Sequence, residues 1–240
     1  MSESLDRPID VPQLTAEEIL ARVLHRDGLM LVIDKPAGLP VHRGPKGGPN
    51  LEASFDALRF GLPRPPVLAH RLDKDTSGCL VLGRHRKATA SLGLLFKHGK
   101  ISKAYWAVVE GGPAGDKGAI DMPLGRLNAE RGWWQKVDPE GQQAVTNWKV
   151  MGRGEGLTWL ALEPVTGRTH QLRVHSSAQG WPIFGDNIYG NGPRFGEPRL
   201  HLHSREIGIP ISKNKEPVRV VAPAPEHMRE RLRACGWNGE

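Results

Sequence analysis

The sequence predicts an α+β fold with a largely antiparallel, mixed central sheet and flanking helices. Short apolar or alternating runs, which are typical of strands, recur along the chain, and only a few segments have helical spacing. These strand patterns follow one another in series, which favours α+β over alternating α/β architecture. At 240 residues the chain is long enough for one sizeable core, and it has no internal repeat.

The beginning of the chain combines a polar lead-in with a first strand. We expect residues 1–24 to be a partly ordered lead-in, because residues 1 to about 18 are polar and carry two prolines. Leu29–Ile33 is an apolar run that ends at Lys35-Pro36, the pattern of a buried strand terminated by proline. Residues 43–50 are turn-rich and include Arg43 and Lys46, so they form either a phosphate contact or a plain flexible loop.

The segment 70–78, which reads HRLDKDTSG, gathers charges and hydroxyls between two apolar segments. A strand end is expected at Pro66–Ala69 before it, and the apolar run Cys79–Leu82 follows it. Charged groups this close to a core are costly unless they are paired or used. The segment is therefore either a polar turn, with Gly78 as its permissive residue, or a functional site.

The remaining elements follow from local patterns. Residues 86–98 place apolar side chains at helical spacing, and Gly99 fits the position after a helix end. Strands are expected at 103–109, 144–150, 157–162 and 217–221, short helices at 170–178 and 225–235, and a hairpin flank at Trp133-Trp134.

Charge and cysteine content restrict the class of protein. The formal net charge of +7 favours a polyanionic partner, although it says nothing about the fold. Two cysteines without a C-x-x-C pair fit a reducing cytoplasm, and Cys79 is expected to be a small buried hydrophobe. No signal peptide pattern or membrane-length apolar run is present, so we expect a cytoplasmic protein with no membrane partner.

Residues 70–78 resemble the signature of the RluA-type pseudouridine synthases, H-R-L-D-x-x-T-S-G, with Asp73 at the position of the catalytic aspartate. Further family elements follow in the same order at 34–39, 103–105, 166–175 and 182–190, so that the likeness spans roughly residues 25 to 225. The resemblance implies a pseudouridine synthase catalytic fold over residues 25–240, without the S4 domain that many members carry. It also implies an RNA pseudouridine synthase, an isomerase.

The resemblance implies three catalytic residues. Asp73 would act as nucleophile or base, and Arg173 would keep it ionised, because a nearby cation lowers the pKa of a carboxylate. Placed on a short helix, Arg173 would project on the same side as His170 and Thr169. Tyr105 would stack on the target base. The plainer interpretations are a surface arginine at 173 and a core tyrosine at 105.

RNA or substrate binding is implied for Arg71, His70, Val174 and Arg168. A uridine within structured RNA must leave its stack to reach Asp73, and Arg71 would fill the space that the base vacates. Alternatively, Arg71 only pairs with Asp73 or Asp75. Val174 would form a wall of the uracil pocket, although any core valine would look the same. The expected partner is RNA, either tRNA, large-subunit rRNA or both, rather than DNA, and we expect a monomer.

No cofactor or metal is expected, since one carboxylate can serve the reaction. The pair His201-x-His203 invites a metal hypothesis, but no cluster of Cys or Glu completes the three or four ligands that zinc needs. A metal-dependent hydrolase therefore fails on ligand count. A catalytically silent RNA-binding protein is the main alternative, and the intact set of Asp73, Tyr105 and Arg173 argues against it.

Overall fold

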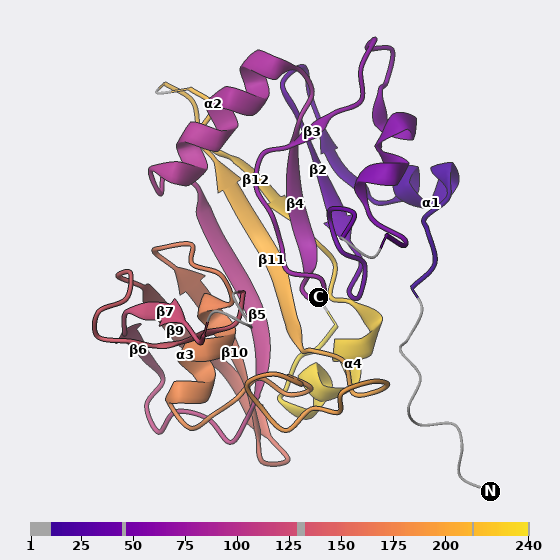
Figure 1. Ribbon diagram of the computed structural model, residues 1–240. Coiled ribbons are helices and arrows are strands. Elements are labelled where there is room, and N and C mark those ends of the chain that lie inside the picture. Colours follow the sequence, from indigo (N-terminus) through magenta and orange to yellow (C-terminus); the bar gives the residue numbers. More distant parts are fainter. Residues whose placement is uncertain (1–10, 45–46, 129–132, 213, 240) are drawn as a thin grey trace, which may run out of the picture. The chain divides into compact units, whose positions relative to one another are not determined.

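The structure, a computed structural model, describes residues 11–44, 47–128, 133–212 and 214–239, which fall into two compact units (Figure 1). The unit called here the Asp73 unit comprises the described residues of 9–102 and 204–223. The other, the Arg173 unit, comprises those of 103–203 and 224–240. Antiparallel strands with few helices make up both units, so the predicted α+β class is confirmed. The division was not predicted, because each unit is assembled from segments that are separate in sequence.

The Asp73 unit consists mainly of antiparallel strand pairs. Strand β2 pairs with β1 and β4, β3 also pairs with β4, and β11 pairs with β12. The strand bounds are β1 Val23–Arg26, β2 Met30–Lys35, β3 Val67–Leu68, β4 Ser77–Gly83, β11 Leu202–Ile209 and β12 Val218–Val221. The helical elements are α1 Ala16–Ala21, the 3-10 helix η1 Glu52–Leu58 and α2 Arg86–Lys97.

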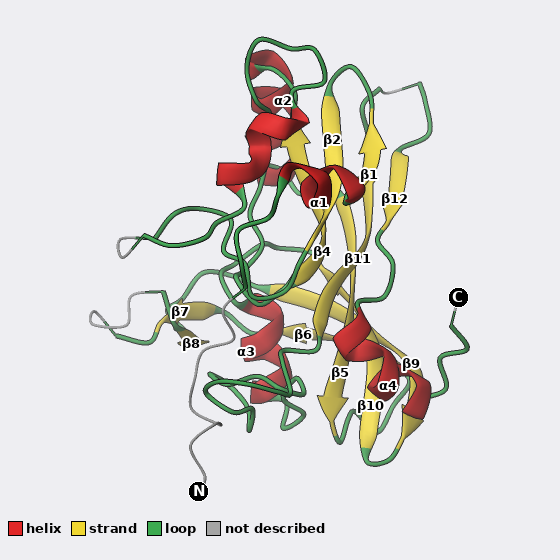
Figure 2. Ribbon diagram, turned by 90° about the vertical axis from the view of Figure 1, so that its right-hand side faces the viewer, coloured by secondary structure: helices red, strands yellow, loops and turns green. Residues whose placement is uncertain are grey.

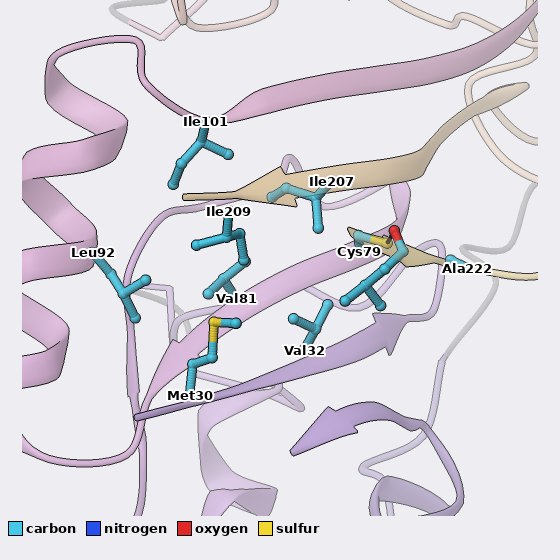
Figure 3. Close-up of a cluster of buried hydrophobic side chains, with 10 residues drawn as sticks. Met30, Val32, Cys79, Val81, Leu92, Ile101, Ile207, Ile209 and Ala222 are labelled. Atoms are coloured by element: carbon cyan, nitrogen blue, oxygen red, sulfur yellow. Dashed lines mark hydrogen bonds between the residues drawn. The ribbon is translucent and has the colours of Figure 1, made fainter. Parts of the chain in front are cut away.

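The core of this unit lies where α2 covers the strands (Figure 3). Val32 on β2 is the register partner of Val81 on β4, and both are fully buried. Leu92 of α2 points toward the same cluster. Cys79 is also fully buried, which confirms its predicted role as a small hydrophobe, and burial raises the pKa of its thiol to about 12.

The described part of the expected lead-in, from residue 11, contains a helix. The helix α1 begins with a capping box, in which Thr15 Oγ1 accepts from Glu18 N and the Glu18 carboxylate accepts from Thr15 N. Ile19 is fully buried, and the Gln13 amide donates to Asn50 O at 2.9 Å. The prolines and polar residues of this segment led us to predict no helix, although the capping-box residues Thr15 and Glu18 that mark its start are present in the sequence.

The Arg173 unit is built on four antiparallel strands in the order β5, β10, β9, β6, with a separate β7–β8 hairpin. Their bounds are β5 Ser102–Glu110, β6 Lys117–Asp121, β7 Leu124–Arg126, β8 Gln135–Val137, β9 Val145–Gly154 and β10 Leu157–Pro164. The helices are α3 Gln171–Ala178 and α4 Glu226–Ala234 (Figure 2). Met228 and Leu232 of α4 are buried in one hydrophobic cluster with Trp159 of β10.

Most of the predicted elements are confirmed, including α2 with Gly99 in the left-handed region just after its end. Trp133 and Trp134 lie just before β8, on the flank of the hairpin as predicted. Lys46 and the residues 130–132 before Trp133 lie outside the described residues. None of the described helices has the length and apolar character needed to cross a bilayer.

Candidate active site

The segment between β3 and β4 forms a tight loop around Asp73. The loop closes through a hydrogen bond from Thr76 N to Asp73 O at 3.2 Å, and Leu72 anchors it by burying its side chain. Asp73 itself is half-buried. Gly78, at the start of β4, has a φ of 102°, a conformation that favours glycine, so the glycine of the signature is required by the backbone.

The buried Lys35 at the end of β2 holds this loop in place. Its ammonium donates to three backbone carbonyls, those of Pro36, Lys74 and Thr76, each at 2.8 Å. The Lys74 carbonyl also accepts from Gly38 N at 3.0 Å. Two of these carbonyls, those of Lys74 and Thr76, lie one and three residues after Asp73. The lysine of the family element at 34–39 therefore positions the loop, a role that the sequence did not reveal.

Two opposing effects set the charge of Lys35. Three carbonyl acceptors match the three N–H donors of an ammonium, since a neutral amine has one donor fewer. Complete burial nevertheless lowers the pKa of Lys35 to about 7, against the charges of Asp75, Asp73 and Asp34, which raise it. Burial likewise raises the pKa of Asp34 to about 6, although the Arg22 guanidinium at 3.9 Å opposes the shift.

His70 and Arg71, which open the loop, differ in their surroundings. His70 Nε2 accepts from Val81 N at 3.0 Å, and the ring stacks on Phe96 of α2 with centroids 4.1 Å apart. These contacts give His70 a structural role, and its contact with substrate stays a prediction. Arg71 is exposed, and in the described part of the chain it forms no ion pair with Asp73 or Asp75. The interpretation in which Arg71 only pairs with these carboxylates is therefore wrong.

In the Arg173 unit, Arg173 forms a buried two-point ion pair with Asp186. Arg173 Nε donates to Asp186 Oδ2 at 2.8 Å and Nη2 donates to Oδ1 at 2.7 Å, with side-chain exposures of 3% and 0%. The alternative of a surface arginine is therefore wrong. Burial alone would raise the pKa of Asp186, but the hydrogen bonds and charge of Arg173 hold it below its usual range.

Asp186 also organises the chain that follows it. Its Oδ1 accepts from Ile188 N at 2.9 Å and from Tyr189 N at 3.0 Å. The Tyr189 ring lies 5.3 Å from the Arg173 guanidinium carbon. Tyr189 Oη accepts from Gln135 N at 2.9 Å and forms a hydrogen bond with His170 Nδ1 at 2.8 Å. The family element at 182–190 thus contacts Arg173 through Asp186 and Tyr189, although the sequence alone assigned no role to Asp186.

The helix carrying Arg173 begins one residue later than predicted. His170 has a φ of 53°, which cannot continue into a helix, and Thr169 lies in the preceding turn. Thr169 and Arg173 therefore do not share a helical face, contrary to the prediction. The turn is fixed by the Gln171 amide, which accepts from Thr166 Oγ1 at 2.7 Å and from Arg168 N at 3.0 Å.

The other predicted site residues of this unit lie on several elements. Tyr105 is buried on β5 opposite Leu162. Val174 is buried in a small cluster with Leu124, Ala144 and Tyr189, while Arg168 is exposed and donates from Nε to Gln143 O at 3.0 Å. Because Asp73 belongs to the other unit, its pairing with Arg173 and its distance from Tyr105 stay predictions.

The histidines that suggested a metal are engaged within the fold. His201 Nδ1 lies 2.7 Å from Arg199 O, and burial lowers the pKa of its ring to about 4. Within the described residues, no three His, Cys, Asp or Glu side chains gather as a metal site would require. A surface hollow of about 550 Å³ over β6, β9 and β10 contains none of the predicted site residues.

A comparison with known protein families shows to which family the chain belongs. The family described as RNA pseudouridylate synthase matches residues 29–178, which include the Asp73 loop, Tyr105 and Arg173. The chain belongs to this family. It is thus a pseudouridine synthase, an isomerase that acts on RNA.

Individual relatives agree with this assignment. An uncharacterized RNA pseudouridine synthase from Zymomonas mobilis is 42% identical over 207 residues, covering 85% of this chain and 94% of the relative. The ribosomal large subunit pseudouridine synthase C of Vibrio parahaemolyticus is 32% identical, with 90% of this chain and 69% of the relative covered. Among solved structures, human RNA pseudouridylate synthase domain containing 4 has a TM-score of 0.75 at 28% identity, covering 91% of this chain and 95% of that one.

Proposed function

We propose that this pseudouridine synthase isomerises specific uridines in tRNA, in large-subunit rRNA or in both, with Asp73 as the nucleophile or base. In the reaction the N1–C1′ bond breaks, the base rotates and a C5–C1′ bond forms. The proton on C5 is lost, and N1 gains one. One carboxylate can therefore serve the whole sequence without a redox change. The relative named for the ribosomal large subunit supports rRNA as one substrate.

The loop geometry is the observation that carries this proposal. Two hydrogen bonds from buried Lys35 fix the backbone carbonyls of Lys74 and Thr76, directly after Asp73, so the carboxylate is presented on a rigid frame rather than a mobile turn. A preorganised group loses little entropy when the substrate binds. A lone polar turn on the surface would not need a fully buried lysine for its support.

The remaining residues take roles around this carboxylate. Arg173 supplies the positive charge that keeps Asp73 ionised, and Asp186 holds the Arg173 fork in a fixed orientation. Tyr105 stacks on the flipped uracil, Val174 forms a wall of its pocket, and Arg71 fills the stack that the base leaves. His70 and Arg168 add contacts to the RNA.

An Asp73→Asn variant tests the proposal, because it keeps the size and removes the charge. Pseudouridine formation in unmodified tRNA and large-subunit rRNA transcripts is measured as carbodiimide adducts that resist alkaline removal. We expect the product of Asp73→Asn to fall below detection while RNA affinity persists. Asp75→Asn, in the same loop, is the matched control and should retain activity. Pseudouridine formed by Asp73→Asn would contradict the proposal, and an inactive wild-type protein that still binds RNA would favour the catalytically silent alternative.

A further inference from the structure

The sequence around helix α2 carries positive charge that no nearby acidic residue in the chain balances. Residues 76–109 contain six Lys and Arg residues and no Asp or Glu. The whole chain has 33 Lys and Arg against 26 Asp and Glu, so this stretch departs strongly from the average. Arg86, Lys87 and Lys97 are exposed on α2 itself, and exposed Lys100 follows it. The outer face of α2 therefore carries positive charge near both of its ends.

The position of these charges opposes the stability of the helix. The N-terminus of a helix has a partial positive charge, which favours acidic side chains in the first turn. The helix α4 follows this rule with Glu226, and α1 follows it with Glu17 and Glu18. The first turn of α2 instead contains Arg86 and Lys87 and no acidic residue. Helix stability thus does not explain these two cations.

The cations of α2 are also unpaired within the described part of the chain. The side chains of Arg86, Lys87 and Lys97 form no ion pair or hydrogen bond there. On α4, by contrast, Arg231 lies 3.7 Å from the Glu155 carboxylate and 3.5 Å from that of Glu230. An external anion would therefore meet the charges of α2 without displacing an internal partner.

The middle of the same face is uncharged, with small side chains at Ala90 and Ser91 beside the exposed Leu94. Ala90 and Ser91 are exposed, and a Cβ placed on Gly93 would meet no atom within 4 Å. A helical glycine that packing does not require is destabilising relative to alanine. Arg86 and Lys97 are separated by about 16 Å at 1.5 Å rise per residue, too far to share one phosphate group. The face therefore fits an extended polyanion better than a single small anion.

The inner face of α2 connects this surface to the catalytic loop of the same unit. Leu92 packs into the hydrophobic core, as Figure 3 shows. Phe96 stacks on the His70 ring, and His70 opens the loop that presents Asp73. The helix that would hold a polyanion on its outer face thus contacts the Asp73 loop through its inner face.

We propose that the outer face of α2, formed by Arg86, Lys87, Ala90, Ser91 and Lys97, docks the phosphate backbone of the RNA that flanks the target uridine. This inference rests on the proposed function, and it adds the surface that holds the RNA in register. Phosphate contacts of this kind position the substrate and leave sequence recognition to other contacts.

The triple variant Arg86→Gln/Lys87→Gln/Lys97→Gln tests this surface. Binding of a fluorescently labelled, unmodified tRNA transcript is measured over a series of salt concentrations. We expect the Kd to rise at least tenfold near 0.15 M salt, and the slope of log K against log salt to become shallower by about 2–3, because each phosphate contact contributes roughly 0.7–0.9. Arg64→Gln/Lys215→Gln/Arg233→Gln removes three exposed charges elsewhere and should change the Kd less than twofold. Equal changes in both triple variants would overturn the proposal.

A second pair of variants separates charge from folding. Ser91→Glu places an acid at the centre of the face, whereas Ser91→Gln has nearly the same size and no charge; both residues favour helix. We expect Ser91→Glu to weaken RNA binding and raise KM at least fivefold with kcat unchanged, and Ser91→Gln to resemble wild type. Equal affinities of the two variants would overturn the proposal. If the wild-type protein binds RNA without forming pseudouridine, the proposed function fails, and the binding data still decide the role of α2.

Discussion

The two units each bury one cation from a signature element, and they stabilise it in different ways. In the Asp73 unit, Lys35 donates to three backbone carbonyls at 2.8 Å and, among the contacts described, donates to no carboxylate. In the Arg173 unit, the guanidinium meets the Asp186 carboxylate through two parallel hydrogen bonds. The first arrangement stabilises the cation with backbone dipoles, and the second pairs it with the opposite charge of a carboxylate.

The different hydrogen-bond partners of Lys35 and Arg173 correspond to different positioning roles. Carbonyl dipoles belong to the backbone, so Lys35 fixes the course of the chain around Asp73. A carboxylate fork fixes the direction of a side chain, so Asp186 orients Arg173 and, through Oδ1, the turn that carries Tyr189. Burial lowers the pKa of Lys35 to about 7, so that the ammonium is partly deprotonated at neutral pH. The pKa of Asp186, by contrast, lies below its usual range, so that its carboxylate stays ionised.

The largest expected change in stability comes from breaking the buried ion pair of Arg173 and Asp186. Asp186→Asn keeps the shape of the side chain and removes the carboxylate charge beside the buried Arg173, which should lower the free energy of unfolding by about 3–5 kcal/mol. Urea denaturation measures the change. Glu206→Gln removes the carboxylate of the exposed Arg219 pair and is the control, expected to cost less than about 1 kcal/mol. Similar losses in both variants would show that the buried pair has no special role.

Replacing Lys35 should lower stability by less than replacing Asp186, but it should lower activity strongly. Lys35→Met leaves three carbonyls without their donor but also removes a costly buried charge, so the free energy of unfolding should fall by only about 1–3 kcal/mol. Because the Asp73 loop loses its frame, we expect kcat to fall more than 100-fold. Lys74→Met, at an exposed side chain of the same loop, is the control. A folded Lys35→Met protein with wild-type kcat would contradict the positioning role.

The smallest and most specific effect is the pH dependence of stability. The pKa of Lys35 is about 7 in the folded protein and 10.5 in the unfolded reference, so the unfolded chain binds more protons between these values. The free energy of unfolding of the wild type should therefore rise with pH over this window relative to Lys35→Met, with a slope of up to ~1.4 kcal/mol per pH unit.

Asp186 in the Arg173 unit should affect the free energy of unfolding at acidic pH instead. Since the folded-state pKa of Asp186 is lowered, its contribution is fully present above the unfolded value of 3.8 and is lost as pH falls through the folded-state pKa. Denaturation midpoints of the wild type, Lys35→Met and Asp186→Asn at several pH values distinguish the two responses. Parallel curves for all three proteins between pH 7 and 10 would contradict the assignment for Lys35.

The sequence by itself determined the features that depend on neighbouring residues. The strand that ends at Lys35-Pro36, the helix that stops before Gly99 and the glycine at position 78 all follow from local backbone preferences, and the structure has each of them. The family signature also identified the residues around Asp73 in advance, because the signature is itself a contiguous string, and the family assignment agrees with it.

Tertiary structure alone decided which distant groups meet. Lys35 finds the carbonyls of Lys74 and Thr76, 39 and 41 residues further along the chain, and Arg173 finds Asp186 across a turn that no local pattern specified. The left-handed conformation of His170, which delays the start of α3, likewise accompanies contacts of its ring with Tyr189 rather than any local propensity. A buried charge must find its partner wherever packing places one, so its identity depends on the folded arrangement and not on sequence spacing.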